Sequence, residues 1–304
     1  MGDEVRIALV HSFYSSRQPS GENRVVEHQY NLLAEAGYDV RLFGRTTDEN
    51  EQSAFFNTRA AFRVATGIGG DPSAEMLKFN PDIVHVHNLF PNFGTQWMPR
   101  WRGPVVVSLH NYRAVCARGD LYRVGAHCEE CATAGSHRAL VHSCYRDSRL
   151  ATLPLALSRS SFQRDVLQAA DAVVTTSHAS DVEIKRLVDF PLTTTLIPNP
   201  GPDEGVEPKA GFLRSGWVAM GRLSPEKGFI ELLESWPSGE SLVIIGSGPM
   251  AEEIDAAIQG TDVIRKNSMP IDDLRNNLTH YVGMVLPSRW IEVAPQVVVE
   301  AMRV

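Results

Sequence analysis

The stretch Trp-Val-Ala-Met-Gly-Arg-Leu-Ser-Pro-Glu-Lys-Gly, residues 217–228, decides the fold of this chain. Its first four residues are apolar and predict a short buried strand, and Gly221 then permits a close approach of the backbone to a ligand. Arg222 and Lys227 bring two cations to the end of that strand. Arginine binds phosphate oxygens in a bidentate manner and lysine acts as a compact charge, so the pair suits a diphosphate. A solvated, charged turn is the alternative interpretation.

A second glycine loop follows the next strand. Residues 244–249 read Ile-Ile-Gly-Ser-Gly-Pro, and a helix is expected directly after them. Gly246 and Gly248 would let the backbone approach a ribose or a base. An ordinary turn explains the same two glycines at least as well.

Short apolar runs alternate with helical periodicity along the whole chain. In the first half, strands are predicted at 5–10, 39–43, 83–86, 105–109 and 172–176, with a helix at 25–36. In the second half, strands at 217–220, 241–245, 263–265 and 282–286 alternate with helices at 229–236, 250–258 and 271–278. Strands that alternate with helices predict an α/β fold with parallel sheets.

Two domains are expected because 304 residues exceed the usual size of one hydrophobic core. Residues 198–211 are dense in proline and glycine and are therefore predicted to be the linker. The predicted domains are 1–197 and 212–304, with a cysteine-rich insertion at 112–150. Ligands bind beyond the carboxyl ends of parallel strands, so a cleft shared by both domains is the expected site.

Two glutamates, Glu292 and Glu300, bracket seven residues shortly before Val304. Pro295 suits the first turn of a helix, because that position has no intrahelical donor to lose. The sequence therefore predicts a loop carrying Glu292 and a helix carrying Glu300. A phosphate or sugar at the helix N-terminus could meet both carboxylates. Two solvated glutamates are the plainer alternative.

Composition argues against several classes of protein. The formal net charge is −7, with nine Lys/Arg against fifteen Asp/Glu in residues 201–304, so a nucleic-acid partner is not expected. No apolar run approaches the roughly 20 residues that cross a bilayer. The first residues lack the basic and apolar regions of a signal peptide, and a cytoplasmic location is expected.

The ordered motifs resemble those of the retaining GT-B glycosyltransferases of family 4. The second half carries the 217–228 and 244–249 loops, Leu-Pro-Ser at 286–288 and the Glu-x7-Glu pair. The first half adds a glycine-containing loop at 19–22, Pro-Asp-Ile-Val-His-Val-His-Asn at 81–88 and Leu-His-Asn at 109–111. The resemblance covers essentially the whole chain. It implies two Rossmann-like domains facing a cleft, the second incomplete at its C-terminus.

The resemblance also implies a donor site in the second domain. Arg222 and Lys227 would grip the diphosphate of a nucleotide sugar, and Glu300 would accept hydrogen bonds from the ribose hydroxyls. Glu292 would hold hydroxyls of the donor sugar, with help from backbone amides of residues 293–297. Protein cations would then neutralise the leaving group without a required metal, and no Asp-x-Asp motif suggests one.

In the first domain, the resemblance implies that His110 lies over the donor sugar and that Gly21 lets the first loop approach phosphate or acceptor. That loop has one glycine where many relatives have two. A buried histidine bonded to backbone is the alternative for His110. His85 and His87 share one face of a strand and are predicted to be packing or acceptor-side groups rather than metal ligands.

The predicted function is transfer of a sugar, with retention, to a glycan, a lipid-linked molecule or a small molecule. A sugar-nucleotide epimerase and a non-catalytic nucleotide-sugar or metal-binding module are the alternatives. Relatives continue beyond the position of Val304, so a fragment or shortened relative with impaired catalysis is expected. An excess of arginine over residues 138–164 could face acidic lipid or an anionic acceptor, although a solvated helix explains it as well.

All cysteines fall in one window, at Cys116, Cys128, Cys131 and Cys144, spaced C-x11-C-x2-C-x12-C. Four thiolates with one C-x2-C pair are consistent with a closed zinc site that orders a long loop. An intracellular location argues against disulfides. A structural zinc ion is the prediction, and unmetallated thiols or an iron–sulfur cluster are the alternatives.

Overall fold

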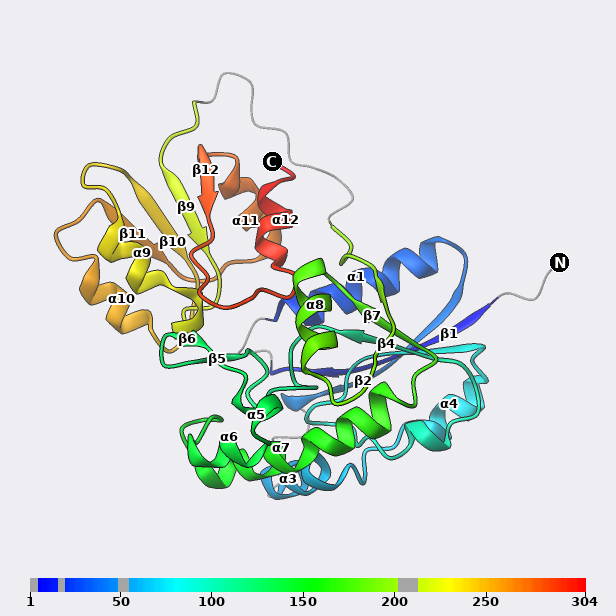
Figure 1. Cartoon of the computed structure of the whole chain (residues 1–304). Helices are drawn as coiled ribbons and strands as arrows, with labels where there is room; N and C mark the ends of the chain where they lie inside the picture. The colour runs from blue at the N-terminus through cyan, green and yellow to red at the C-terminus, as the bar shows by residue number, and fades with distance from the viewer. Residues whose placement is uncertain (1–4, 16–19, 49–54, 202–212) are drawn as a thin grey trace. The chain divides into compact units, whose positions relative to one another are not determined.

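A computed structural model describes residues 5–15, 20–48, 55–201 and 213–304 (Figure 1). The chain divides into two compact units. Unit 1 comprises Met1–Leu121 and Cys128–Pro200, and unit 2 comprises Tyr122–His127 and Gly201–Val304. Most of the predicted linker lies outside the described residues.

Unit 1 is built on a parallel sheet of six strands in the order β2-β1-β3-β4-β7-β8. The central strands are buried on both faces, and Ala8, Leu9 and Val10 of β1 have no exposed surface. Burial on both faces explains why these strands are continuous apolar runs in the sequence. The strands are β1 (Arg6–Phe13), β2 (Asp39–Thr46), β3 (Ile83–Asn88), β4 (Val105–Leu109), β7 (Ala172–Thr175) and β8 (Thr194–Leu196).

The helices of unit 1 differ in length and in how their ends are capped. Ser148 caps α7 by accepting a hydrogen bond from the Ala151 amide, and Ser177 and Ser180 form a capping box on α8. The helices are α1 (Gly21–Glu35), α3 (Phe56–Thr66), α4 (Ser73–Phe79), α5 (Glu130–Thr133), α6 (His137–Val141), α7 (Arg149–Phe162) and α8 (His178–Leu187).

Unit 2 contains a parallel sheet of four strands in the order β11-β10-β9-β12 and a small hairpin, β5–β6. The strands are β9 (Trp217–Met220), β10 (Leu242–Ile245), β11 (Val263–Lys266), β12 (Gly283–Val285), β5 (Tyr122–Arg123) and β6 (Ala126–His127). The helices are α9 (Phe229–Ser235), α10 (Ala251–Ala257), α11 (Ile271–Leu278) and α12 (Gln296–Ala301).

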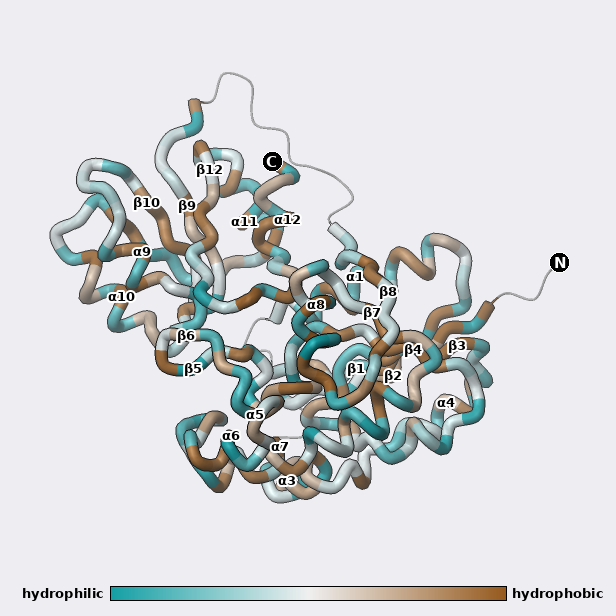
Figure 2. The backbone as a smooth tube through the Cα atoms, in the orientation of Figure 1, coloured by the Kyte–Doolittle hydropathy of each residue, from teal (hydrophilic) through white to brown (hydrophobic). Residues whose placement is uncertain are grey.

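Consecutive residues of β9 pack on opposite faces of the unit 2 sheet. Ala219 packs with Phe229 of α9 and Ile254 of α10. Met220 packs on the other face with Leu274 of α11. The side-chain period of two thus gives a helix layer on each side, and Figure 2 shows apolar residues gathered along the strands.

The predicted parallel α/β architecture is confirmed. The strand at 105–109 and the helix at 271–278 are found with the predicted bounds, while the helix predicted at 250–258 is shorter at both ends. Strand β8 and the β5–β6 hairpin were not predicted. Pro295 lies just before α12 rather than in its first turn. Among the described helices, none is both long and apolar enough to span a bilayer.

Candidate functional site

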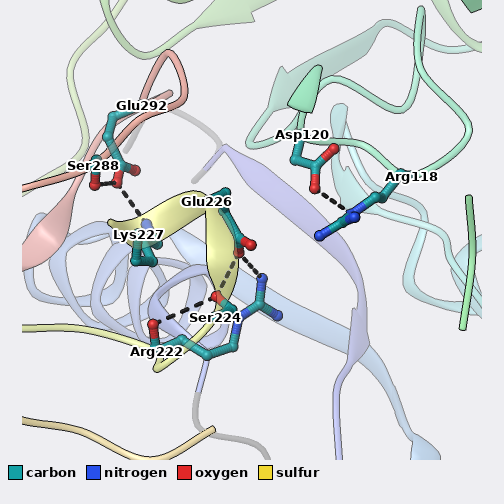
Figure 3. Close-up of polar contacts among 8 residues, drawn as sticks. All are labelled: Arg118, Asp120, Arg222, Ser224, Glu226, Lys227, Ser288 and Glu292. Atoms are coloured by element: carbon teal, nitrogen blue, oxygen red, sulfur yellow. Dashed lines mark hydrogen bonds and ion pairs between the residues drawn. The ribbon is translucent and has the colours of Figure 1, made fainter. Parts of the chain in front are cut away.

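The loop after β9 holds Arg222 through a buried carboxylate (Figure 3). Arg222 Nη2 donates to Glu226 Oε1 at 2.9 Å, and Ser224 Oγ donates to the same oxygen at 2.6 Å. Burial opposes ionisation of Glu226, but hydrogen bonds from Ser224 and the backbone and the charge of Arg222 prevail and lower its pKa. Glu226 was not predicted from the sequence, although it lies inside the motif. It fixes the orientation of a guanidinium that is half exposed.

Lys227 and Glu292, which lie 65 residues apart in sequence, meet in the structure. Lys227 Nζ donates to Glu292 Oε1 at 2.6 Å, and the Ser288 hydroxyl donates to the same oxygen (Figure 3). The ammonium also lies 4.9 Å from the centre of the Trp290 ring. The structure therefore unites a predicted phosphate-binding cation with a predicted sugar-binding carboxylate. Ser288 and Trp290 were not predicted to act in this site.

Glu300 is buried in α12 and bonded to a cation that the sequence did not indicate. Arg275 Nε of α11 donates to Glu300 Oε2 at 2.8 Å. The carboxylate has 8 % of its side chain exposed, so its partner balances a nearly desolvated charge. In this state Glu300 is held by Arg275, and its predicted contact with a ribose remains a prediction.

The three glycines predicted to approach a ligand bring two loops together. A Cβ atom at Gly246 would lie 2.0 Å from the Gly221 carbonyl oxygen, and one at Gly248 would lie 2.3 Å from that of Leu223. The Leu223 amide donates to the Ser247 carbonyl at 3.0 Å. Glycine is therefore needed for contact between the loops that follow β9 and β10. A ligand contact at these positions remains a prediction.

In unit 1, His110 lies just after β4 within a group of histidines. His87 Nδ1 lies 2.9 Å from His110 Nε2, and the His85 and His87 rings stack with centroids 4.3 Å apart. Burial, with the neighbouring His11 and His85 adding to it, lowers the pKa of His110 to about 3. Burial lowers that of His11, at the end of β1, to about 4. These imidazoles are neutral near pH 7. His85 and His87 share a face as predicted.

Gly21 is the first residue of α1, and the adjacent Glu22 was not predicted. Burial raises the pKa of Glu22 to about 7, although Arg113 and Asn111 act in the opposite direction. Glu22 Oε1 is buried without a hydrogen-bond partner. Of the predicted loop at 19–22, the described part begins at Ser20, so the phosphate contact of this loop stays a prediction.

A cavity beside the histidines enters unit 1. It encloses about 750 Å³ of space, part of it open to solvent. Its walls are mainly apolar and come from the ends of β3 and β4 and from α3 and α7, and its polar lining includes His87, His110 and Arg113. The arrangement places two neutral imidazoles and one guanidinium next to an apolar recess.

The four predicted metal ligands all lie in unit 1. Cys116 and Cys131 are buried, and Cys128 and Cys144 are half-buried.

Comparison with known proteins adds a family and a fold. The model of the family described as Glycosyltransferase Family 4 matches residues 19–201. No curated protein matches the chain. A sucrose-phosphate synthase from Thermosynechococcus elongatus is 18% identical with a TM-score of 0.62, and the match covers 98% of this chain and 79% of that one.

Two further solved structures share the fold. AviGT4, a glycosyltransferase involved in avilamycin A biosynthesis, is 15% identical with a TM-score of 0.52, and the match covers 98% of this chain and 76% of that one. An α-glucosyltransferase in complex with UDP and a DNA 13-mer is 11% identical with a TM-score of 0.50. The match covers 92% of this chain and 72% of that one. At sequence identities this low, the similarity to these solved structures shows a shared fold and nothing more.

Proposed function

Because this chain belongs to Glycosyltransferase Family 4 and has the GT-B fold, we propose that it moves a sugar from a nucleoside diphosphate sugar to a hydroxyl acceptor with retention of anomeric configuration. The observation that carries the proposal is the loop after β9. Arg222 and Lys227 stand at the carboxyl end of a parallel strand, and each is held by a carboxylate. Ligands of open α/β sheets bind at that end of the strands.

The paired cations retain capacity for phosphate. A guanidinium and an ammonium each carry more N–H donors than one carboxylate oxygen uses. Arg222 and Lys227 can therefore bind phosphate oxygens while Glu226 and Glu292 hold them in position. Pre-positioned donors of this kind stabilise charge that develops on a leaving group. The fold relative solved with UDP is consistent with a nucleoside diphosphate in this role.

In the proposed reaction, the bond between the sugar C1 and the diphosphate oxygen breaks, and a bond from C1 to the acceptor oxygen forms on the same face. The hydroxyl proton leaves with the diphosphate. Glu292 would contact hydroxyls of the donor sugar, and Glu300 would accept from the ribose. Neutral His110 would act as a hydrogen-bonding group.

Among the acceptor classes, a lipid-linked molecule is favoured by helix α7. Leu150, Leu153 and Leu157 are 81%, 40% and 56% exposed and follow an i, i+3, i+7 pattern on one face. The helix contains no acidic residue and begins with the exposed Arg149. An apolar face with basic residues suits an anionic membrane surface. Co-sedimentation with phosphatidylglycerol vesicles should fall in a Leu150→Glu/Leu157→Glu variant, and equal binding would remove this support.

Donor turnover tests the proposal. The chain is incubated with UDP-, GDP-, ADP- and dTDP-sugars, with and without a panel of acceptor alcohols, and free nucleoside diphosphate is measured. Release that requires an acceptor, with a product of unchanged anomeric configuration by NMR, supports transfer with retention. Formation of an epimeric nucleotide sugar would instead indicate an epimerase. Binding of a nucleotide sugar without turnover would indicate a non-catalytic module.

A further inference from the structure

The cysteine window takes no part in the proposed transfer, yet its four cysteines gather in one region of unit 1. Cys116 and Cys131 influence each other electrostatically, as do Cys131 and Cys128. Cys144 packs against the same small core as Cys131, together with Ala139. Residues separated by up to 28 positions in the sequence thus converge on one region.

Backbone N–H groups surround two of these sulfurs. Those of Gly119 and Leu121 lie within hydrogen-bonding reach of the Cys116 sulfur. Those of Ala117 and Ala139 lie in the same way against the Cys131 sulfur. A neutral thiol is a weak acceptor, whereas hydrogen bonds to sulfur are a regular feature of metal–thiolate sites.

The same segment concentrates strained backbone. Six non-glycine residues of the described chain have positive φ, and five of them lie at 121–147: Leu121, Val124, Ser143, Arg146 and Asp147. Such conformations cost roughly 1–3 kcal/mol each and persist only where the surroundings fix them. The regular elements here are helices of four and five residues and a hairpin of two-residue strands, which can fix little on their own.

Two carboxylates near the cysteines, those of Asp120 and Glu130, are already bonded to cations. Asp120 pairs with Arg118 at 2.5 Å (Figure 3). Glu130 Oε2 accepts from Arg138 Nε at 2.7 Å, and His142 Nε2 lies 2.9 Å from the same oxygen.

We propose that Cys116, Cys128, Cys131 and Cys144 bind one zinc ion in a closed structural site that fixes segment 112–148. In the described chain no three of these sulfurs lie within 4.8 Å of one another. A tetrahedral site with Zn–S bonds of about 2.3 Å places sulfurs about 3.8 Å apart. A bound ion would therefore have to draw the cysteine side chains together. Four thiolates and no open position give zinc a structural role.

Metal analysis of protein purified without chelator tests the proposal. We expect about one zinc per chain in the wild type, as a closed four-thiolate site holds one ion. Cys128→Ser and Cys131→Ser should lose it, and His142→Gln, in the same segment, should retain it. Wild-type protein without stoichiometric zinc, or cysteine variants that keep it, would overturn the proposal. Detection of iron with acid-labile sulfide instead of zinc would show that the cysteines hold an iron–sulfur cluster, and would also overturn the proposal.

A second measurement uses only the wild-type protein, so misfolding of a cysteine variant cannot affect its result. Metal-free wild-type protein is titrated with Co²⁺. Tetrahedral thiolate coordination gives strong d–d and thiolate-to-cobalt charge-transfer bands that saturate at one equivalent and disappear on addition of Zn²⁺. Protection of segment 112–148 from limited proteolysis should rise in parallel. Absence of the bands in protein that is folded by circular dichroism would refute the site.

Discussion

The carboxyl ends of the two sheets differ in charge although both sheets are parallel and flanked by helices. In unit 2, Arg222, Lys227 and their carboxylates lie at or near these ends. In unit 1, the corresponding positions carry imidazoles kept neutral by burial, among them His110. One architecture thus offers held cations in one unit and a group of neutral imidazoles in the other.

The difference matches the two kinds of group that glycosyl transfer must handle. A nucleoside diphosphate gains negative charge as it leaves, and fixed cations stabilise that charge with little reorganisation. An acceptor hydroxyl is neutral, and burying a charge beside it would cost free energy without a matching gain. We therefore expect changes in unit 2 to affect donor chemistry and changes in unit 1 to affect neutral groups.

The largest effect is expected from removing a held cation. Lys227→Ala or Arg222→Ala should lower the rate of nucleoside diphosphate release by 10²–10³-fold, because loss of one oxyanion donor costs roughly 2.7–4 kcal/mol. Steady-state release of nucleoside diphosphate measures the effect.

Lys185→Ala is the matched control, since Lys185 forms a comparable ion pair with Asp181 at 2.8 Å on unit 1. It should change turnover less than about twofold, as exposed pairs contribute little. Equal turnover in wild type and the Lys227 and Arg222 variants would reject the role assigned to these cations.

The buried carboxyl of unit 1 gives the next effect. The pKa of Glu22 is raised from 4.5 to about 7 in the folded state, so the unfolded chain releases its proton first as pH rises. Folding stability should therefore fall between about pH 4.5 and pH 7 and remain lower above. At pH 8, the free energy of unfolding of the Glu22→Gln variant should exceed that of the wild type by up to about 3 kcal/mol. Near pH 4 the two free energies should agree.

Urea denaturation at pH 5 and pH 8 measures this difference. Glu35→Gln, an exposed substitution at the end of the same helix, is the control. Its free energy of unfolding should stay within about 0.5 kcal/mol of the wild-type value at both pH values. A Glu22→Gln variant with the same pH dependence as wild type would show that Glu22 is ionised at ordinary carboxyl pH.

A smaller effect is expected at Glu300. Glu300→Gln keeps the shape of the side chain but weakens its bond from Arg275 and its capacity to accept from ribose hydroxyls. Charged hydrogen bonds contribute about 1.5–3 kcal/mol, so affinity for the nucleoside diphosphate should fall roughly 10- to 100-fold. Calorimetry with UDP, GDP and ADP measures it, and an unchanged dissociation constant would remove Glu300 from the ribose site.

Features that depend on local pattern are predictable from the sequence. The strand at 217–220 and the cations at its end follow from apolar run length and residue type. The pairing of Lys227 with Glu292 was not predicted, because it depends on how β12 and its loop return to β9. Glu226 and Glu22 were also missed, because burial of a carboxylate is a tertiary property that leaves no signal in local sequence.

The smallest effect is expected from the titration of His110. Because burial lowers its pKa to about 3, the ring should stay neutral from pH 8 down to pH 5, and transfer should show no ionisation near 6.5 from this residue. NMR of ring C–H resonances in histidine-labelled protein measures this directly. A His110 transition near pH 6.5 would mean that unit 1 also presents a cation near neutral pH. The contrast between held cations in unit 2 and neutral groups in unit 1 would then fail.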